Sequence, residues 1–206
     1  MKDPPDLAIL REFAKKLGHN VAGLLERPFV HYVATNLPEK ARDHFFGLQE
    51  AKRDLVGIAI FDNLDKNLQE GTALTEMMWL KKEIENYLCV EDVLLAYARH
   101  DQPDDLFGQA ESARREQTMR DVIGEISAAL KALKKPDPWS SEIKVTDEFL
   151  DPVFEKYFEK LGLPNLLRKT DYHLLANFVS KEKIDHEVIE KLDAIVKTAS
   201  KAKPLN

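Results

Sequence analysis

Two stretches decide the fold: residues 56–62 read VGIAIFD, and residues 77–88 read MMWLKKEIENYL. The first is a short, continuous apolar run that ends on an aspartate. Between helical segments, a run of this length predicts a central parallel strand at 56–61, buried on both faces. A second apolar run predicts another strand at 74–80, and the polar residues 63–71 predict a loop between the two strands.

The segment before these strands predicts two helices and one further strand. Apolar residues recur at helical spacing from residue 7 to residue 17, and Gly18 follows as a stop signal. The segment 29–35 (FVHYVAT) is rich in β-branched and aromatic residues, which favours a strand. Asn36 is expected to cap the next helix. This order of elements predicts an α/β fold with a small parallel sheet flanked by helices.

The chain becomes helical towards its C-terminal half. We expect an α/β domain at residues 1–99, followed by an all-helical extension at residues 100–206. The long helix of the extension also makes a homodimer a candidate assembly. The expected helices lie at residues 90–99, 109–135, 147–161, 172–179 and 186–198.

Composition limits the class of protein. The 206 residues include 30 Lys and Arg against 36 Asp and Glu, a net charge of −6. This acidic balance is not that of a purely electrostatic DNA binder, but it suits a site where carboxylates gather around metal ions. Cys89 is the single cysteine, so a disulfide framework is excluded and a cytoplasmic location is expected. No apolar run approaches the roughly 18 residues of a membrane span, so no membrane partner is expected.

Carboxylates follow both predicted strands. Asp62 ends the first strand and Asp65 lies three residues later, while Glu83 and Glu85 follow the second. Because ligands bind at the carboxyl ends of strands in open α/β sheets, these side chains are expected to share one rim. Carboxylate oxygens suit Mg²⁺ or Mn²⁺. Glu83 and Glu85 are two residues apart and point to different sides, so at most one is expected to bind a metal directly.

Four segments resemble a known family. Residues 57–67 (GIAIFDNLDKN) and 77–88 are similar to the second half of the TOPRIM domain of OLD-family (overcoming lysogenization defect) ATPase/nucleases. Residues 6–18 (DLAILREFAKKLG) resemble the helix after the family's first strand, with Asp6 at an acidic motif position. Residues 167–178 (LRKTDYHLLANF) resemble the region that carries an active-site lysine in the family.

The resemblance implies a Mg²⁺- or Mn²⁺-dependent DNA nuclease with a role in phage defence. DNA and an ATPase domain or subunit are the partners it implies. Asp62, Glu83, Glu85 and Lys169 would be the catalytic residues. The metal ligands would be Asp6, Asp62, Asp65 and Glu85.

Two departures from the family pattern leave alternatives open. Lys2 and Asp3 stand where the family has Glu and Gly, with no strand before them, and Leu64 stands at the second Asp of its D-x-D motif. The chain is then either a fragment without its first strand or a degenerate domain. It also lacks the G-x-x-x-x-G-K-(S/T) motif of an ATPase. A non-catalytic interaction or regulatory module beside an ATPase is therefore the alternative function, and an α/β protein with a helical dimerisation arm is the third.

Overall fold

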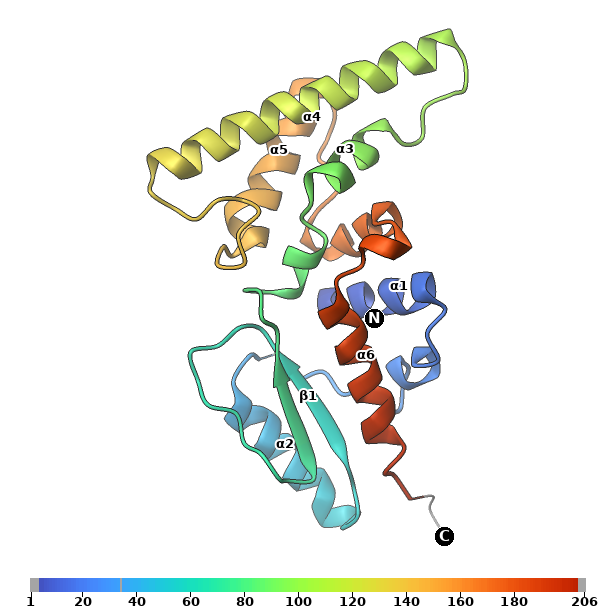
Figure 1. The fold of residues 1–206 in the computed structure, drawn as a ribbon, viewed down its shortest axis with the longest axis vertical. Coiled ribbons are helices and arrows are strands. Elements are labelled where there is room, and N and C mark those ends of the chain that lie inside the picture. Colours follow the sequence, from blue (N-terminus) through green and yellow to red (C-terminus); the bar gives the residue numbers. More distant parts are fainter. Residues whose placement is uncertain (1–3, 34, 204–206) are drawn as a thin grey trace.

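The computed structural model describes residues 4–33 and 35–203 as a mixed α/β structure that is mostly helical (Figure 1). Strand β1 (Gly57–Phe61) pairs in parallel with β2 (Leu74–Met78). Gly57 lies opposite Leu74, and Phe61 lies opposite Met78. The predicted α/β class with a small parallel sheet is thereby confirmed. Lys2 and Asp3 lie outside the described residues.

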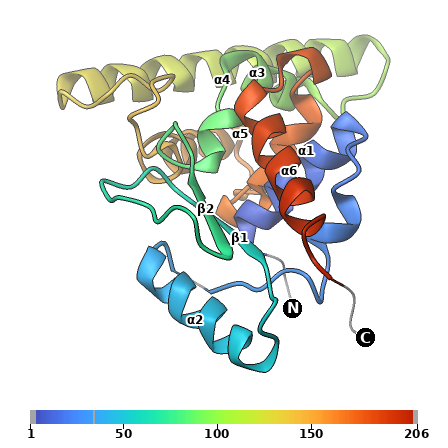
Figure 2. The same ribbon diagram turned by 60° about the horizontal axis from the view of Figure 1, so that its bottom comes forward.

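Two helices cover the sheet from opposite sides (Figure 2). Helix α2 (Pro38–Ala51) packs on one face, and α6 (His186–Ala199) packs against β1 on the other. Arg42 of α2 donates two hydrogen bonds, of 2.6 and 2.8 Å, to the Glu76 carboxylate of β2. The Glu76 side chain is shielded from water, so water competes little for its carboxylate. This charge-assisted, bidentate pair therefore holds α2 firmly on the sheet.

The remaining elements are helical. None of the helices in the described ranges is long and apolar enough to cross a lipid bilayer. Gly18 and Gly162 end α1 and α5 in the left-handed conformation, and for Gly18 this confirms the stop predicted from the sequence. The elements are α1 (Pro5–Leu17), η1 (Ala22–Leu25), η2 (Ile84–Tyr87), α3 (Glu91–Arg99), α4 (Leu106–Ala132), the π-helix η3 (Thr146–Leu150), α5 (Asp151–Leu161), the 3-10 helices η4 (Lys169–Phe178) and η5 (Lys181–Lys183), and α6.

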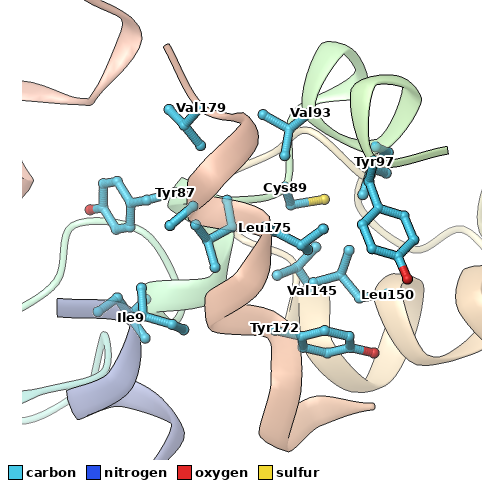
Figure 3. Packing of buried hydrophobic residues seen from close by; sticks show 14 of the residues in the cluster. Ile9, Tyr87, Cys89, Val93, Tyr97, Val145, Leu150, Tyr172, Leu175 and Val179 are labelled. Atoms are coloured by element: carbon cyan, nitrogen blue, oxygen red, sulfur yellow. The ribbon is translucent and has the colours of Figure 1, made fainter. Parts of the chain in front are cut away.

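One hydrophobic cluster joins α1, α3, α4, α5, η4 and α6 (Figure 3). Ile9 of α1 packs in the same cluster as Val93 of α3, Leu150 of η3 and Leu175 of η4. Residues on both sides of position 99 therefore share one core. Cys89 is buried in this cluster, and burial raises the pKa of its thiol. A buried thiol of raised pKa is an inert, structural cysteine.

The strand predicted at 29–35 is wrong. Residues 30–33 and 35 have no regular structure, and Ala34 lies outside the described residues. Phe29 and Tyr32 are 67% and 64% exposed. High β-propensity measures how well a side chain fits a half-buried sheet surface, and no such surface covers these aromatic rings.

Two further expectations at the sheet need correction. Asn36 does not cap α2, whose N-cap is Leu37 without a side-chain hydrogen bond. The strand at 57–61 is not central, since the described sheet has two strands and β1 is half-buried except for Phe61. An apolar run of five residues cannot distinguish a central strand from one whose neighbours are helices.

Replacing Gly108 by alanine is expected to lower the free energy of unfolding by about 2 kcal/mol or more. A Cβ atom at this position, in the first turn of α4, would lie 1.9 Å from the carbonyl oxygen of Pro103. The backbone at Pro103 would have to move, because a backbone carbonyl oxygen cannot swing away as a flexible side chain can. Urea denaturation followed by circular dichroism measures the change.

Gly124→Ala is the matched control, because Gly124 lies in the middle of the same helix and a Cβ atom added there would meet nothing within 4 Å. Alanine is there expected to raise the stability by about 0.5–1 kcal/mol, the helix-propensity difference. Equal effects of the two substitutions would contradict the close approach of α4 to Pro103.

Candidate functional site

The carboxyl ends of the two strands carry the candidate site. The Trp79 amide, just after β2, donates to the carbonyl of Phe61 at 2.9 Å. The Asn63 amide donates to the Lys82 carbonyl at 3.1 Å, and its side chain donates to the Leu80 carbonyl at 2.8 Å. The loop after β1 and the loop after β2 are thus joined, as expected for neighbouring parallel strands.

Asp62 directly follows β1 and is held by Asn36. The Asn36 side-chain amide donates to the Asp62 carboxylate at 3.0 Å, and its carbonyl oxygen accepts from the Asp62 backbone amide at 3.1 Å. Partial burial raises the pKa of Asp62 to about 6, and the negative charges of Asp6 and Glu83 contribute to this shift. Asp62 therefore takes up its proton near pH 6, about two pH units above an ordinary aspartate, and is mostly ionised at pH 7.

Glu83 ties the acidic loop to the helical region. It is buried, and its carboxylate accepts a 2.5 Å hydrogen bond from the backbone amide of Thr146, the first residue of η3. The Glu83 backbone amide donates to the Asn86 side chain at 3.0 Å, whose own amide donates to the carbonyl of Ile143 at 3.1 Å. One carboxylate oxygen of Glu83 thus serves a structural hydrogen bond that connects the acidic loop to η3.

Glu85 lies in η2, two residues after Glu83, and is only 3% exposed. Burial raises its pKa to about 8, and the nearby charges of Glu83 and Asp6 add to the shift. Its own backbone and the charge of Lys169 act in the opposite direction. A buried carboxyl group among other carboxylates is costly to ionise. Of Glu83 and Glu85, it is therefore Glu85 whose ionised form a bound cation would stabilise.

Asp6 and Lys169 complete the cluster from distant parts of the sequence. Helix α1, which begins at Pro5, packs closely on η4, which begins at Lys169. The pKa of Asp6 is raised chiefly because the surrounding protein excludes water, while Lys169 lowers it. Lys169 also acts on Asp62 and Glu85. The charges of Asp6, Glu83 and Lys169 therefore act on Asp62 and Glu85, which links these five residues electrostatically.

Asp65 is not drawn into this group. It is exposed in the loop after β1 and is not among the leading charges that shift the pKa of Asp62 or Glu85. The loop residues 63–73 have no regular structure to direct its side chain to the rim.

Sequence reasoning missed Lys144. It lies just before η3, its ammonium group hydrogen-bonds to Asp147, and its charge lowers the pKa of Asp62. Hydrogen bonding to Asp147 raises the pKa of Lys144, and Glu83 and Asp62 add to this. A lysine some 80 residues from Asp62 in sequence leaves no local pattern that would identify it.

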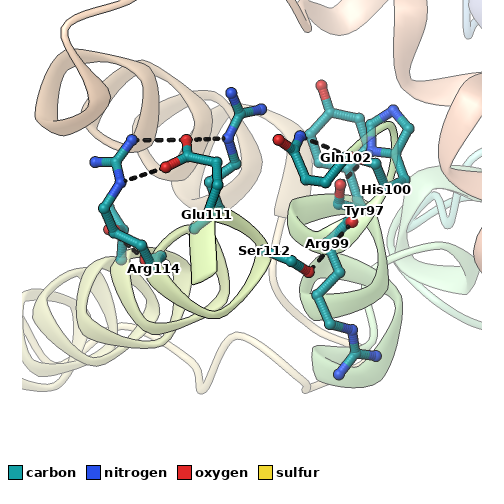
Figure 4. A network of polar contacts seen from close by, with 9 residues as sticks. Tyr97, Arg99, His100, Gln102, Glu111, Ser112 and Arg114 are labelled. Atoms are coloured by element: carbon teal, nitrogen blue, oxygen red, sulfur yellow. Dashed lines mark hydrogen bonds and ion pairs between the residues drawn. The ribbon is translucent and has the colours of Figure 1, made fainter. Parts of the chain in front are cut away.

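The arginines of α4 belong to a separate surface network (Figure 4). Arg114 and Arg115 both bind the Glu111 carboxylate, with Nε to oxygen distances of 2.7 Å. Arg120 binds Glu116 one turn away at 2.7 Å. These pairs follow the spacing of neighbours on one helix, so they form a solvated face of α4 rather than part of the carboxylate cluster.

Geometry sets a limit on metal binding by the protein alone. Within residues 4–33 and 35–203, no group of three or more His, Cys, Asp or Glu side chains is arranged to hold a metal ion. Asp62 and Glu85 remain as two carboxyl groups whose pKa values are raised by burial and by the charges of Asp6 and Glu83. Mg²⁺ commonly keeps several waters and binds one or two carboxylates, with substrate phosphates completing its shell.

No protein-family model matches this chain, and no curated protein or solved structure matches it either. Its function is therefore inferred from the side chains at the rim and from the resemblance of residues 57–88 described above.

Proposed function

We propose that the chain is a TOPRIM-like, Mg²⁺- or Mn²⁺-dependent DNA nuclease domain related to OLD-family proteins. One observation carries the proposal: the negative charges of Asp6 and Glu83 raise the pKa values of Asp62 and Glu85, which follow the two parallel strands. Such repulsion destabilises a folded protein unless a cation relieves it. Carboxylates kept together at this cost are typical of a functional site.

The donor set fits a hard divalent cation. Asp62 and Glu85 would hold it through oxygen atoms, which Mg²⁺ and Mn²⁺ prefer, and the charge of Asp6 acts on both of them. The cation, when bound, would supply neutralisation of the phosphate charge and activation of water for phosphodiester hydrolysis.

The protein's own groups have separate tasks in this proposal. Asn36 orients the Asp62 carboxylate through its two hydrogen bonds. Glu83 holds the acidic loop on Thr146, so it positions Glu85 rather than binding the cation itself. Lys169, which acts on the ionisation of Asp6, Asp62 and Glu85, would bind a phosphate oxygen of the substrate and stabilise its developing charge.

Asp62→Asn is expected to lower the rate of plasmid nicking in Mg²⁺ or Mn²⁺ by about 100-fold or more. The substitution removes a ligand charge but keeps the shape of the side chain and an oxygen that can accept from Asn36. Asp65→Asn is the matched control, three residues away and exposed, and its rate should stay within about threefold of the wild type. Full activity of Asp62→Asn would contradict the assignment.

A second candidate is a non-catalytic interaction or regulatory module that partners an ATPase. The observation that favours it is the lack of a three-residue metal group among the described residues. Isothermal titration calorimetry with Mn²⁺ separates the two candidates. Binding that is lost in Glu85→Gln, together with nicking, supports the nuclease, whereas an absence of both supports the module.

A further inference from the structure

One carboxylate at the edge of the cluster is shared by two lysines. The ammonium group of Lys144 hydrogen-bonds to Oδ2 of Asp147, and that of Lys169 lies 3.9 Å from Oδ1. Each oxygen of Asp147 therefore faces a different lysine. The three side chains are 49%, 47% and 50% exposed, in the order Lys144, Lys169 and Asp147, so water and solutes can reach them.

The two lysines are also neighbours of the acidic rim. Both act on the ionisation of Asp62, and Lys169 acts on Glu85 as well. They come from separate segments, Lys144 before the π-helix η3 and Lys169 at the start of η4. Short π-helical segments occur frequently at functional sites, and this one carries Asp147 as its second residue.

We propose that Lys144 and Lys169 form a phosphate-binding subsite, and that Asp147 occupies it in place of a phosphodiester group. This inference rests on the proposed nuclease function and extends it to the substrate contact. A phosphodiester carries one negative charge over two free oxygens, as a carboxylate does, and lysine binds phosphate as a point charge. Nucleic acid entering the site would displace Asp147 and take over both lysines.

The chain contains a matched control for this arrangement. Glu125 of α4 is bound by Lys156 and Lys160 of α5, again one carboxylate between two lysines. Lys156 and Lys160 are not among the charges that shift the pKa values of Asp62 and Glu85, whereas Lys144 and Lys169 both act on Asp62. Asp147→Asn and Glu125→Gln thus change the net charge equally, and each releases two lysines. The lysines released by Asp147→Asn act on the rim, whereas those released by Glu125→Gln do not.

Fluorescence anisotropy of a labelled DNA duplex, in EDTA and over a range of KCl concentrations, tests the subsite without any cleavage. Asp147→Asn is expected to tighten DNA binding about fivefold, because the competing charge is removed. Glu125→Gln should change it less than about twofold. In addition, Lys144→Gln should reduce the slope of log K against log salt by about one, and Lys156→Gln should leave it unchanged.

Equal tightening by Asp147→Asn and Glu125→Gln, or a salt slope that Lys144→Gln does not alter, would overturn the subsite. These outcomes are independent of nuclease activity. A wild-type protein that never nicks DNA, but shows the difference between the two variants, would retain the subsite and lose the proposed nuclease function. A nicking protein whose two variants bind alike would retain the function and lose the subsite.

Discussion

Replacing Glu187 by alanine is expected to lower the free energy of unfolding by about 4 kcal/mol, a large share of the stability of a domain of this size. Glu187 lies in the first turn of α6 and is 6% exposed. One carboxylate oxygen accepts from the Leu80 backbone amide at 2.9 Å and lies 2.9 Å from the ammonium group of Lys191, and the other accepts from the hydroxyl of Tyr87.

Alanine would leave two buried groups, the Lys191 ammonium group and the Tyr87 hydroxyl, without their partner, and would also free the Leu80 amide. Lys191 is 5% exposed, and its ammonium group lies 5.5 Å from the centre of the Trp79 ring, so its charge has little access to water. An unpaired buried charge costs more than the pair contributed, and the freed hydroxyl of the buried Tyr87 adds a further penalty. The loss is therefore far larger than for an exposed ion pair.

Urea denaturation of four variants, Glu187→Ala, Lys191→Met, the double variant and a Glu190→Ala control, separates pairing from other effects. Glu190→Ala, on the same helix but exposed, is expected to change stability by no more than about 0.5 kcal/mol. The double variant Glu187→Ala with Lys191→Met should lose less than the sum of the two single losses, since no buried charge is then left alone. Additive losses would mean that the two side chains do not interact in the folded state.

The same network explains how the acidic loop is held. Leu80 and Tyr87 stand at the two ends of the loop that carries Glu83 and Glu85, and Glu187 binds both ends. From within the loop, Glu83 binds Thr146 and Asn86 binds Ile143. The position of Glu85 thus depends on segments that lie some 60 to 100 residues later in the chain.

This dependence marks the limit of prediction from the sequence. Asp62, Glu83 and Glu85 could be placed at one rim, because an apolar run, its end and the geometry of parallel strands are local features. Lys169 was assigned from a family resemblance. Glu187 gave no signal, since a glutamate in the first turn of a helix is ordinarily a solvated residue.

Asn36 shows the same limit on a smaller scale. It stands before a helix that starts with Pro38, which is a typical place for an N-cap. Its side chain instead binds Asp62, 26 residues away. A local rule predicts which nearby backbone groups a side chain can bind. A charged partner that is distant in sequence offers a stronger hydrogen bond, and here it determines where the Asn36 side chain points.

Glu85→Gln is expected to stabilise the protein in the absence of divalent cations, and to do so more at higher pH. Burial and neighbouring charges raise the pKa of Glu85 from 4.5 to about 8. Between these values the unfolded chain has lost a proton that the folded protein keeps, so wild-type stability falls as pH rises through this interval. Glutamine does not titrate, so the gain should be about 3.5 kcal/mol larger at pH 8 than at pH 5.

Thermal and urea unfolding at several pH values, in EDTA, measure this difference. Glu70→Gln is the control, because Glu70 is exposed in the loop between β1 and β2, where the charge is screened by water. Its effect should be the same at pH 5 and pH 8. A Glu85→Gln variant whose gain does not grow with pH would contradict the assigned burial of this carboxyl group.

Mn²⁺ should reverse the ranking of the two proteins. A cation bound at Glu85 favours the ionised carboxylate, so it stabilises the folded wild type by mass action and removes part of the pH-dependent loss. Glu85→Gln, with one ligand charge fewer, should respond much less and should nick DNA poorly. Stability and catalysis would then make opposite demands on one residue, which explains why a buried glutamate is kept where glutamine would fold better. If Mn²⁺ stabilised both proteins equally, Glu85 would not be a ligand and its cost would have no compensating role.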